Sequence, residues 1–491
     1  MCIRSTTLLQ LFISLMLAGM SACDSTEPSE EPAPPRIISV SDTTQVNQTV
    51  DVVAVAVSAD NTPLTYEIDW GDKRGLQSVP DVESGLYVTL QNRYFDPGNY
   101  SMRCRVIDAG GHVSAWSQTL QLHVYGQSVV GKGDWWMFMH DAQHTGRSSY
   151  QGPLSPVLLW KYHAASPIST SMTFEASSPT RSRATFDAYG HVYVGADDFR
   201  LHAILPGGAP RWQYWSGNAQ IQNSPAIASD GSVYFGGSSA NIYRINRFGL
   251  KEWNTSTNTA ITTSSVALDD DGSIYIGSED GGLYCLDNDG IVVWQMVTNG
   301  PITGSTALPR DGTRIYFGSS DRILYAADRQ GNLVWTYPTG GAISGSPSIG
   351  PHGSIFFGSE DKYVYALTMN GNLRWKHNLH AAVRSAPAIG IEGHIYVVTS
   401  DGVLYCFDNA GTVIWDLRFS SAGADSSPIL DVLETVYVSD IEGILYAVSR
   451  SGKLLWQYDT EAPVHSTPSI GPNGIIVIGD DDGILHAIGD K

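Results

Sequence analysis

The sequence predicts an all-β protein in which a small β-sandwich precedes an eight-bladed β-propeller. Three observations lead to this fold class. The 491 residues include 50 glycines and 24 prolines but only 16% charged residues, which excludes a coiled coil or a long helical bundle. Apolar residues make up 42% and aromatic residues 10%, so the chain is not disordered. Tryptophans recur at intervals near 40 residues from position 160 onward, which is the period of a propeller repeat rather than of a helical solenoid.

The chain is acidic, with 29 Lys and Arg against 49 Asp and Glu. A nucleic-acid backbone would be repelled by this charge, so nucleic acid is not an expected partner. Five cysteines over this length form no disulfide framework.

Residues 1–22 are predicted to be a lipoprotein signal peptide. One arginine precedes an apolar run at 8–17, and small residues follow, which is the layout of a secretory signal. The stretch Met20-Ser21-Ala22-Cys23 resembles a bacterial lipobox, although that motif more often has Leu in place of Met20. The resemblance implies lipidation at Cys23. The alternative is ordinary cleavage nearby, with an incidental cysteine.

Residues 23–35 are predicted to be a tether, because the stretch after the cysteine is acidic, rich in proline and free of large apolar side chains. An acidic patch directly after the cysteine resembles export signals that carry lipoproteins to the cell surface in some bacterial groups. Asp24 alone resembles an inner-membrane retention signal in others. The expected location is the bacterial cell envelope, with the outer membrane (cell surface or periplasmic face) favoured over the inner membrane.

Residues 36–125 are predicted to form the sandwich, since the runs at 50–57 and 100–106 alternate with a period of two. Three signatures resemble the PKD family of immunoglobulin-like domains. They are Trp70-Gly71-Asp72, the aromatic corner YFDPGNY at 94–100, and Asp108-Ala109-Gly110-Gly111. A Tyr near such a corner can hydrogen-bond back to the chain. The family's module is usually a spacer or adhesion unit, so no chemistry is expected at Trp70 or Asp72.

After a connector at 126–155, the chain repeats through 156–491. The repeat tryptophans are Trp160, Trp212, Trp253, Trp294, Trp335, Trp375, Trp415 and Trp456. One unit, 300–338, shows four short strand-like runs separated by turn residues such as Asp311-Gly312. Four antiparallel strands per unit make one propeller blade.

Eight third strands can be counted, but the eighth unit reaches Lys491 before any fourth strand. The spare tryptophan strand is 156–162, at the other end of the repeats. An open ring would leave unpaired strand edges, so we expect 156–162 to close the ring as the outer strand of the eighth blade. The first two tryptophans are 52 residues apart, which indicates an insertion of about a dozen residues in the first blade, within 164–183.

The repeats and the segment that contains Trp135-Trp136-Met137-Phe138 and His144-Thr145-Gly146 resemble the PQQ-like (quinoprotein-type) β-propeller superfamily over roughly 135–491. The family's repeat has a small residue in the third strand and a tryptophan in the fourth. Here the small residue stands nine positions before its tryptophan at 203, 285, 326, 366, 406 and 447, and Arg244 departs from the pattern. The resemblance implies the fold but no cofactor, because one fold hosts many functions.

Quinone dehydrogenases of this superfamily hold their cofactor against two adjacent cysteines and a calcium ion. This sequence has no Cys-Cys pair, and Cys285 and Cys406 fall at the same place in different blades, beyond disulfide distance. The acidic runs at 269–272 and 480–483 lack the ligand spacing of an EF-hand and are interpreted as solvated turns. No cofactor, metal site or catalytic residue is therefore expected.

Comparing the repeats with one another points to one candidate binding site. Just before the first strand, the units carry residues that differ from blade to blade: Ala176, Gln222, Thr262, Thr303, Ser344, Arg384, Asp425 and His465. If the first strands line the central channel, these side chains ring its mouth, with Arg384, Asp425 and His465 side by side. One interpretation is a recognition patch for an anionic or hydroxylated ligand. The other, which we favour, is a solvated ion pair worth little energy.

Taken together, the sequence predicts a monomeric, non-enzymatic cell-envelope lipoprotein whose propeller binds or scaffolds a protein or glycan partner. Within the superfamily it looks more like the propeller lipoprotein of the outer-membrane β-barrel assembly machinery than like the dehydrogenases, although that lipoprotein lacks a PKD-like module. Two alternatives stay open: a quinoprotein-type oxidoreductase and a surface glycan-binding protein.

Overall fold

The structure is a computed structural model that describes residues 32–39, 43–45, 49–71, 76–94, 98–125, 135–164, 182–350 and 353–490. The chain divides into two compact units, Met1–Val129 and Val130–Lys491. The described residues form strands and turns, with a 3₁₀ turn at Pro472–Gly474. The predicted all-β fold class is thus confirmed. No helix in the described ranges is long and apolar enough to cross a membrane.

The first unit consists of two sheets over one core. The first sheet has the order β1 (Arg36–Ser39), β3 (Thr49–Val55) and β6 (Tyr87–Arg93). The second has the order β2 (Thr43–Gln45), β8 (Leu120–Tyr125), β7 (Gly98–Ile107), β4 (Leu64–Asp69) and β5 (Leu76–Val82). All pairs are antiparallel except β2 with β8. The alternation seen in the sequence places every second side chain of β4 in the core.

Trp70 and Tyr94 are packing residues of this unit. The Tyr94 hydroxyl donates a hydrogen bond to the Trp70 carbonyl at 2.9 Å, and both side chains are buried. The Trp70 indole N–H donates to Gln77 Oε1 at 2.7 Å. Asp72 lies outside the described residues. The two aromatic side chains therefore fix the corner of the unit, as a tyrosine near such a corner can do.

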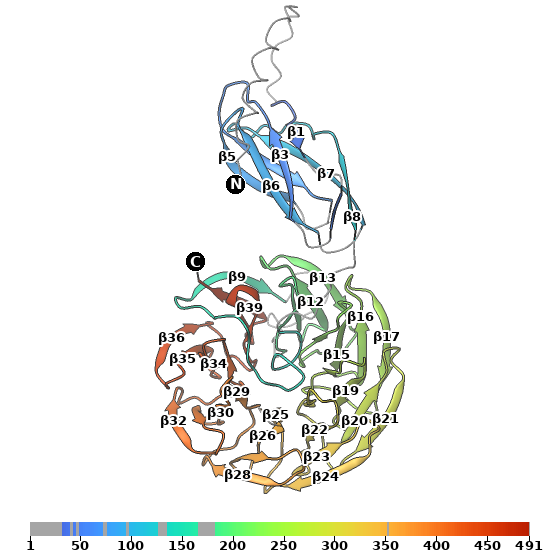
Figure 1. The fold of residues 1–491 in the computed structure, drawn as a ribbon, viewed down its shortest axis with the longest axis vertical. Coiled ribbons are helices and arrows are strands. Elements are labelled where there is room, and N and C mark those ends of the chain that lie inside the picture. Colours follow the sequence, from blue (N-terminus) through green and yellow to red (C-terminus); the bar gives the residue numbers. More distant parts are fainter. Residues whose placement is uncertain are drawn as a thin grey trace, which may run out of the picture. The chain divides into compact units, whose positions relative to one another are not determined.

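The described residues of the second unit form eight sheets arranged around a ring (Figure 1). The first sheet consists of β10 (Thr185–Phe186), β11 (Val192–Gly195), β12 (Arg200–Ile204) and β13 (Pro210–Trp215), and the second of β14 (Ala226–Ile227), β15 (Val233–Gly237), β16 (Asn241–Ile245) and β17 (Lys251–Ser256). The third sheet consists of β18 (Ala267–Leu268), β19 (Ile274–Gly277), β20 (Gly282–Leu286) and β21 (Val292–Val297). The fourth consists of β22 (Ile315–Gly318), β23 (Ile323–Ala327) and β24 (Leu333–Pro338), and a bridge from Ala307 to Tyr316 takes the place of its first strand.

The next three sheets are β25 (Ser348–Ile349), β26 (Ile355–Gly358), β27 (Tyr363–Leu367) and β28 (Leu373–Asn378); β29 (Ala388–Ile389), β30 (Ile395–Val398), β31 (Val403–Phe407) and β32 (Val413–Arg418); and β33 (Ile429–Leu430), β34 (Val436–Ser439), β35 (Ile444–Val448) and β36 (Leu454–Asp459). The eighth sheet is β37 (Ser469–Ile470), β38 (Ile476–Gly479), β39 (Ile484–Gly489) and β9 (Val157–His163).

Burial follows from this packing of sheets against one another. Second strands such as β19 and β22 are buried along their whole length, because neighbouring sheets cover both of their faces. Fourth strands such as β21 lie at the perimeter and alternate between half-buried and exposed positions. Cys285 and Cys406 are free, buried residues in β20 and β31 of two different sheets.

The eighth sheet takes its outer strand from the start of the repeats. β9 pairs antiparallel with β39, and Trp160 lies opposite Ala487. The backbone N–H groups of Leu154 and Ser155 donate to the carboxylate of Asp490 at 3.1 and 2.7 Å, which fastens the start of β9 to the end of the chain. The two ends of the repeat region therefore share one sheet.

Each repeat tryptophan joins its sheet to the next one. The indole N–H donates to a backbone carbonyl of the neighbouring sheet at 2.8–3.2 Å in all eight cases. The donor and acceptor pairs are Trp160–Pro206, Trp212–Arg247, Trp253–Asn288, Trp294–Arg329, Trp335–Met369, Trp375–Asn409, Trp415–Arg450 and Trp456–Pro153. The ring of Trp294 also lies against Gly331, where φ is +81° and a Cβ atom would fall 2.6 Å from the indole. Glycine is needed there for both reasons.

Residues 135–152, which we call the strap, pack against the first strands of the propeller sheets. In Figure 1 the teal segment that precedes β9 crosses the middle of the ring. Backbone N–H groups at the ends of first strands donate to strap carbonyls in six sheets, in the pairs Phe186–Trp135, Ile227–Trp136, Leu308–Ala142, Ile349–Gln143, Ile389–Thr145 and Leu430–Gly146. The strap side chains Met137, Phe138, Met139 and His144 are buried. The strap therefore covers one end of the channel.

We expect Trp160→Ala to lower stability, but by less than for a fully buried tryptophan. The Trp160 side chain is only partly buried, where its ring lies against Gly208. A loss of about 1–3 kcal/mol is expected, below the 3–5 kcal/mol typical of a buried tryptophan. Denaturant unfolding followed by tryptophan fluorescence measures it.

Trp215→Ala is the control, because Trp215 is 63% exposed and stands outside the repeat register. Its cost should stay within about 0.5 kcal/mol. Equal unfolding midpoints for the parent and both variants would show that β9 does not hold the ring closed.

Candidate functional site

The strand register fixes which residues form the mouth of the channel. We call the predicted residues at the mouth of the channel the rim. In each unit the rim residue lies four residues before the first-strand residue that pairs with the second strand. For Gln222 that residue is Ala226, which pairs with Tyr234. The same count gives Thr303, Ser344, Arg384, Asp425 and His465 in their units. In the third unit it gives Thr263, one residue after the expected Thr262. Ala176 lies outside the described residues.

Most predicted rim side chains bind acceptors in their own or a neighbouring sheet. Gln222 Nε2 donates to Asp197 at 2.9 Å, Arg384 Nε to Glu360 at 3.2 Å, and His465 Nδ1 lies 2.9 Å from Asp481. The acidic partners come from turns between second and third strands. Thr262 binds Glu279, and Thr303 Oγ1 donates to the carbonyl of Ser344.

Arg384, Asp425 and His465 do not form one cluster. Within the described ranges no hydrogen bond or ion pair joins any two of them. Asp425 is exposed, and the pair of Arg384 with Glu360 has side chains 52% and 39% exposed. Such a pair contributes little free energy. The rim is therefore a set of separate, hydrated pairs.

A second ring of side chains lies two residues further along each first strand. Here a hydroxyl accepts the backbone N–H of the preceding sheet at 2.7–3.1 Å, in the pairs Ser224–Ser265, Ser265–Ser305, Ser305–Ser346, Ala386–Ser427 and Ser427–Thr467. We call Ser224, Ser265, Ser305, Ser346, Ser427 and Thr467 the hydroxyl belt. The first strands are so short that these backbone N–H groups have no acceptor in a strand beside them. The hydroxyl groups of the belt accept their hydrogen bonds instead.

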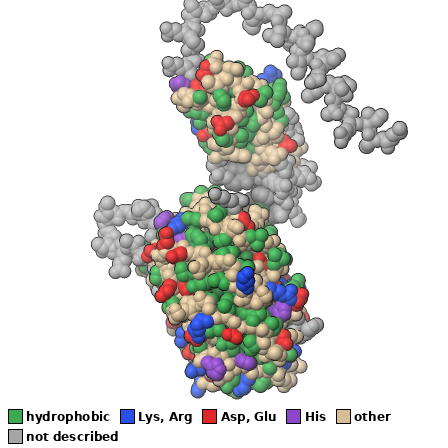
Figure 2. All heavy atoms as spheres, turned by 90° about the vertical axis from the view of Figure 1, so that its left-hand side faces the viewer, with side chains coloured by type: hydrophobic (Ala, Val, Ile, Leu, Met, Phe, Trp, Pro, Cys, Tyr) green, Lys and Arg blue, Asp and Glu red, His purple; other side chains and the backbone are tan. Residues whose placement is uncertain are grey.

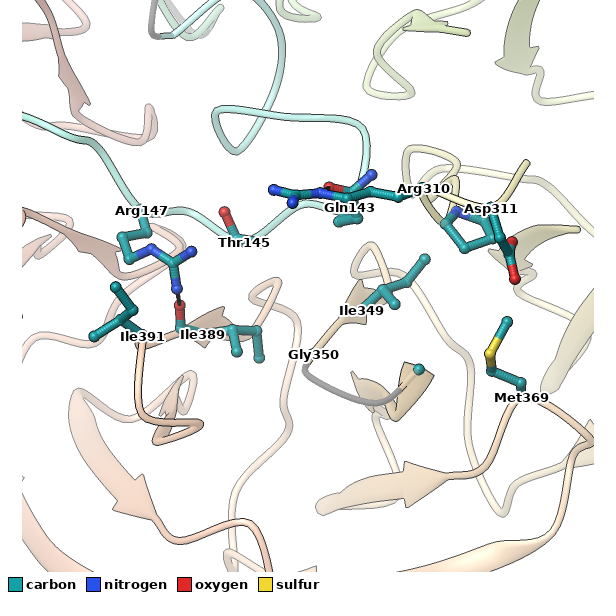
Figure 3. A pocket seen from close by; sticks show the side chains of 12 residues that line it. Gln143, Thr145, Arg147, Arg310, Asp311, Ile349, Gly350, Met369, Ile389 and Ile391 are labelled. Carbon is teal, nitrogen blue, oxygen red and sulfur yellow. Dashed lines mark hydrogen bonds between the residues drawn. The ribbon is translucent and has the colours of Figure 1, made fainter. Parts of the chain in front are cut away.

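A cavity of about 380 Å³ lies where the strap passes the turns after three first strands. Figure 3 shows Arg147 and Arg310 on the strap side, with Ile349, Ile389 and Met369 opposite. Arg147 Nη1 donates to the Ile389 carbonyl at 3.1 Å, and Arg310 Nε to Gln143 Oε1 at 3.2 Å. Sequence reasoning missed this cavity, because its walls come from five distant segments.

Glu434 forms a buried carboxylate network between the sixth and seventh sheets. Its carboxylate accepts from His394 Nδ1 and the Tyr396 hydroxyl at 3.0 Å, and Arg450 Nε lies 3.3 Å away. Burial alone would raise its pKa, but the hydrogen bonds and the charge of Arg450 hold the pKa below its usual value. Glu434 has φ of +60°, where the corresponding residue of the neighbouring unit is Gly393.

Other groups with shifted pKa values recur at the same position in several sheets, and their role is structural. A third-strand tyrosine donates to an aspartate of the preceding turn at 2.6–2.8 Å in four sheets, in the pairs Tyr284–Asp280, Tyr325–Asp321, Tyr365–Asp361 and Tyr446–Asp440. Burial, followed by the hydrogen bond to Asp280, raises the pKa of Tyr284 to about 12. In the described part of the chain, no three His, Cys, Asp or Glu residues are placed to hold a metal ion.

The Glu434 network predicts a loss of stability in acid. A carboxyl group with a lowered pKa stabilises the fold above its unfolded pKa, and this contribution disappears as the pH falls through the folded pKa. We therefore expect Glu434→Gln to be less stable by about 1–3 kcal/mol at pH 7 and to lose less stability than the parent between pH 5 and 3. Urea unfolding across this range measures both effects.

Glu392→Gln is the matched control. Glu392 also pairs with Arg450, but its side chain is 61% exposed. That variant should keep the parent's dependence on pH. The same dependence in Glu434→Gln as in the parent would exclude Glu434 as the group responsible.

Comparison with known proteins identifies the repeat. The family model described as "Outer membrane protein assembly factor BamB" matches residues 238–349 and 320–473. BamB from Moraxella catarrhalis is similar in structure, with a TM-score of 0.55 and 16% identity over 68% of this chain and 98% of that protein. The computationally designed Ika8 protein is similar too, with a TM-score of 0.56 and 15% identity over 65% of this chain and 98% of that one. No curated protein matches the sequence. Residues 238–473 of this chain are therefore similar to the repeat of that family, and the fold is that of BamB-like propellers.

Proposed function

We propose that this protein is a lipid-anchored, non-enzymatic component of the bacterial cell envelope whose eight-bladed propeller binds a protein partner. In this proposal Cys23 carries the anchor, residues 23–35 are the tether, and the PKD-like unit at 36–125 is a spacer. The propeller, closed by the strand that begins near residue 156, is the binding part.

The observation that carries the binding role is the chemistry of the outer strands. Each fourth strand is the last in its sheet, so one row of its N–H and C=O groups faces outward. Proteins usually protect such edges with charged side chains. Five of the fourth strands made within the repeats follow this rule at their outward positions, with Arg211, Glu252, Arg374, Asp416 and Asp459 among the residues there.

Two neighbouring outer strands break the rule. The outward positions of β21 are Val293, Gln295 and Val297, and those of β24 are Val334, Thr336 and Pro338. Val293 and Val297 are 61% and 67% exposed. By contrast, Figure 2 shows the side of the propeller on which β32 and β36 lie, where acidic and basic side chains are interspersed among hydrophobic ones. An uncharged, apolar edge is suited to a partner that adds an extended segment to the sheet.

The comparisons with known proteins also favour a role in binding other proteins. The matching family is described as an assembly factor of the outer membrane, and a solved relative of similar fold is BamB itself. An assembly factor works by holding other proteins, which agrees with an exposed protein-binding edge. The partner is identified only by its chemistry, as an apolar extended segment of a protein.

A photoreactive phenylalanine analogue at position 295 should capture this partner in intact cells. Gln295 is exposed on β21 and pairs in register with Tyr284. Gln457 on β36 has the same register, opposite Tyr446, and is the matched control. We expect a discrete cross-linked band from position 295 and none from position 457.

Val293→Lys places on β21 the kind of charge that other outer strands carry. It should remove the cross-link at 295 and change stability by no more than about 0.5 kcal/mol, because the position is exposed. Equal cross-linking from 295 and 457, or a cross-link that persists in Val293→Lys, would refute the proposed edge.

Cys23→Ala tests the anchor. Without the acyl chains, the mature protein should move from the membrane fraction to the soluble fraction, because lipid chains supply the membrane affinity of a tethered protein. Fractionation, together with mass spectrometry of the mature N-terminus, measures this. A variant that stays in the membrane fraction, with no lipid mass on the parent's N-terminus, would contradict lipidation.

A further inference from the structure

The hydroxyl belt has one charged position. Six of the eight units carry Ser or Thr there, and the sixth unit carries Ala386. In the first unit the belt position is Arg183, two residues before Thr185, which pairs with Tyr193 of β11. A guanidinium group thus occupies a place that small hydroxyl groups fill in most other sheets.

The contacts of Arg183 place its guanidinium inside the ring. Its Nε donates to Thr467 Oγ1 of the eighth sheet at 3.0 Å. Its Cζ lies 4.7 Å from the ring centroid of Phe138 in the strap. The charge of Asp425, in the seventh sheet, acts on it from the rim. Three different segments therefore surround the side chain between the strap and the mouth of the channel.

The guanidinium has donors to spare. Arginine carries five N–H groups, and one hydrogen bond of the described residues uses one of them. None of the ion pairs between described residues includes Arg183. Burial lowers the pKa of Arg183 to about 10, and the charge of Asp425 compensates only in part. The side chain is half-buried, so its charge is partly removed from water, and an anion bound beside it would offset that cost.

We propose that Arg183 is the anchor of an anion-binding site in the propeller channel and that its ligand is a carboxylate. The planar fork of a guanidinium matches the two oxygens of a carboxylate. Hydroxyl groups of Thr467 and Ser427 lie in the adjoining belt positions. Asp425 and Asp481 stand at the rim of the same sheets, and they oppose a doubly charged phosphate more strongly than a singly charged carboxylate. This site is separate from the β21 edge and does not depend on the proposed partner.

The test uses butyrate as the carboxylate probe on the purified protein, with sodium chloride at equal ionic strength as the reference and inorganic phosphate as a second anion. Saturating butyrate should raise the melting temperature of the parent by about 2–4 °C. Saturation-transfer NMR should show transfer to the butyrate methylene protons. Arg183→Ser, which restores the belt residue of other units, should lose both signals.

Two controls separate binding from folding. Arg384→Ser removes an exposed rim arginine and should keep the full response to butyrate. Without ligand, Arg183→Ser should melt at least as high as the parent, because it removes a partly buried charge. The proposal is overturned if Arg183→Ser still responds, if it melts several degrees lower without ligand, if phosphate binds and butyrate does not, or if the parent responds to neither anion.

Discussion

The propeller depends on one interaction, the contact of each repeat tryptophan with the next sheet. A four-stranded sheet alone cannot cover both of its apolar faces, so the sheets are stable only when packed side by side. In six of the sheets the acceptor carbonyl stands 34 or 35 residues after the indole, which imposes a repeat of nearly constant length. Trp160 reaches its acceptor after 46 residues, so the additional residues of the first unit are accommodated without disturbing the contact.

The same contact explains what the sequence could reveal. The all-β class follows from composition and spacing and is confirmed, and the resemblance of the repeats to the PQQ-like superfamily agrees with the family model that matches residues 238–349 and 320–473. The path of the strap across the ring was not predictable, because about one hydrogen bond per sheet leaves no periodic pattern. The rim partners were missed for a related reason: Asp197 and Glu360 stand 25 and 24 residues from Gln222 and Arg384, in turns whose contacts no local pattern marks.

Departures from the repeat are more informative than the repeat itself. A side chain shared by all sheets is explained by packing, whereas Glu434, Ala386 and Arg183 each break a rule that most units obey. Glu434 adopts a left-handed backbone conformation that a glutamate rarely takes, and such strain persists only when the surroundings hold it in place. Three donors do so here: Tyr396, which is buried, His394, which is half-buried, and Arg450, which is exposed.

These departures are not spread evenly around the ring. Ala386, Glu434 and Arg183 belong to the sixth, seventh and first sheets, which form a continuous arc together with the eighth. The uncharged outer strands β21 and β24 belong to the third and fourth sheets. The inner arc differs in its charged and hydrogen-bonding groups, and the outer edge differs in its lack of charge. A symmetric scaffold can bind different ligands only where its symmetry is broken, and here it is broken in two chemically distinct ways at two separate places.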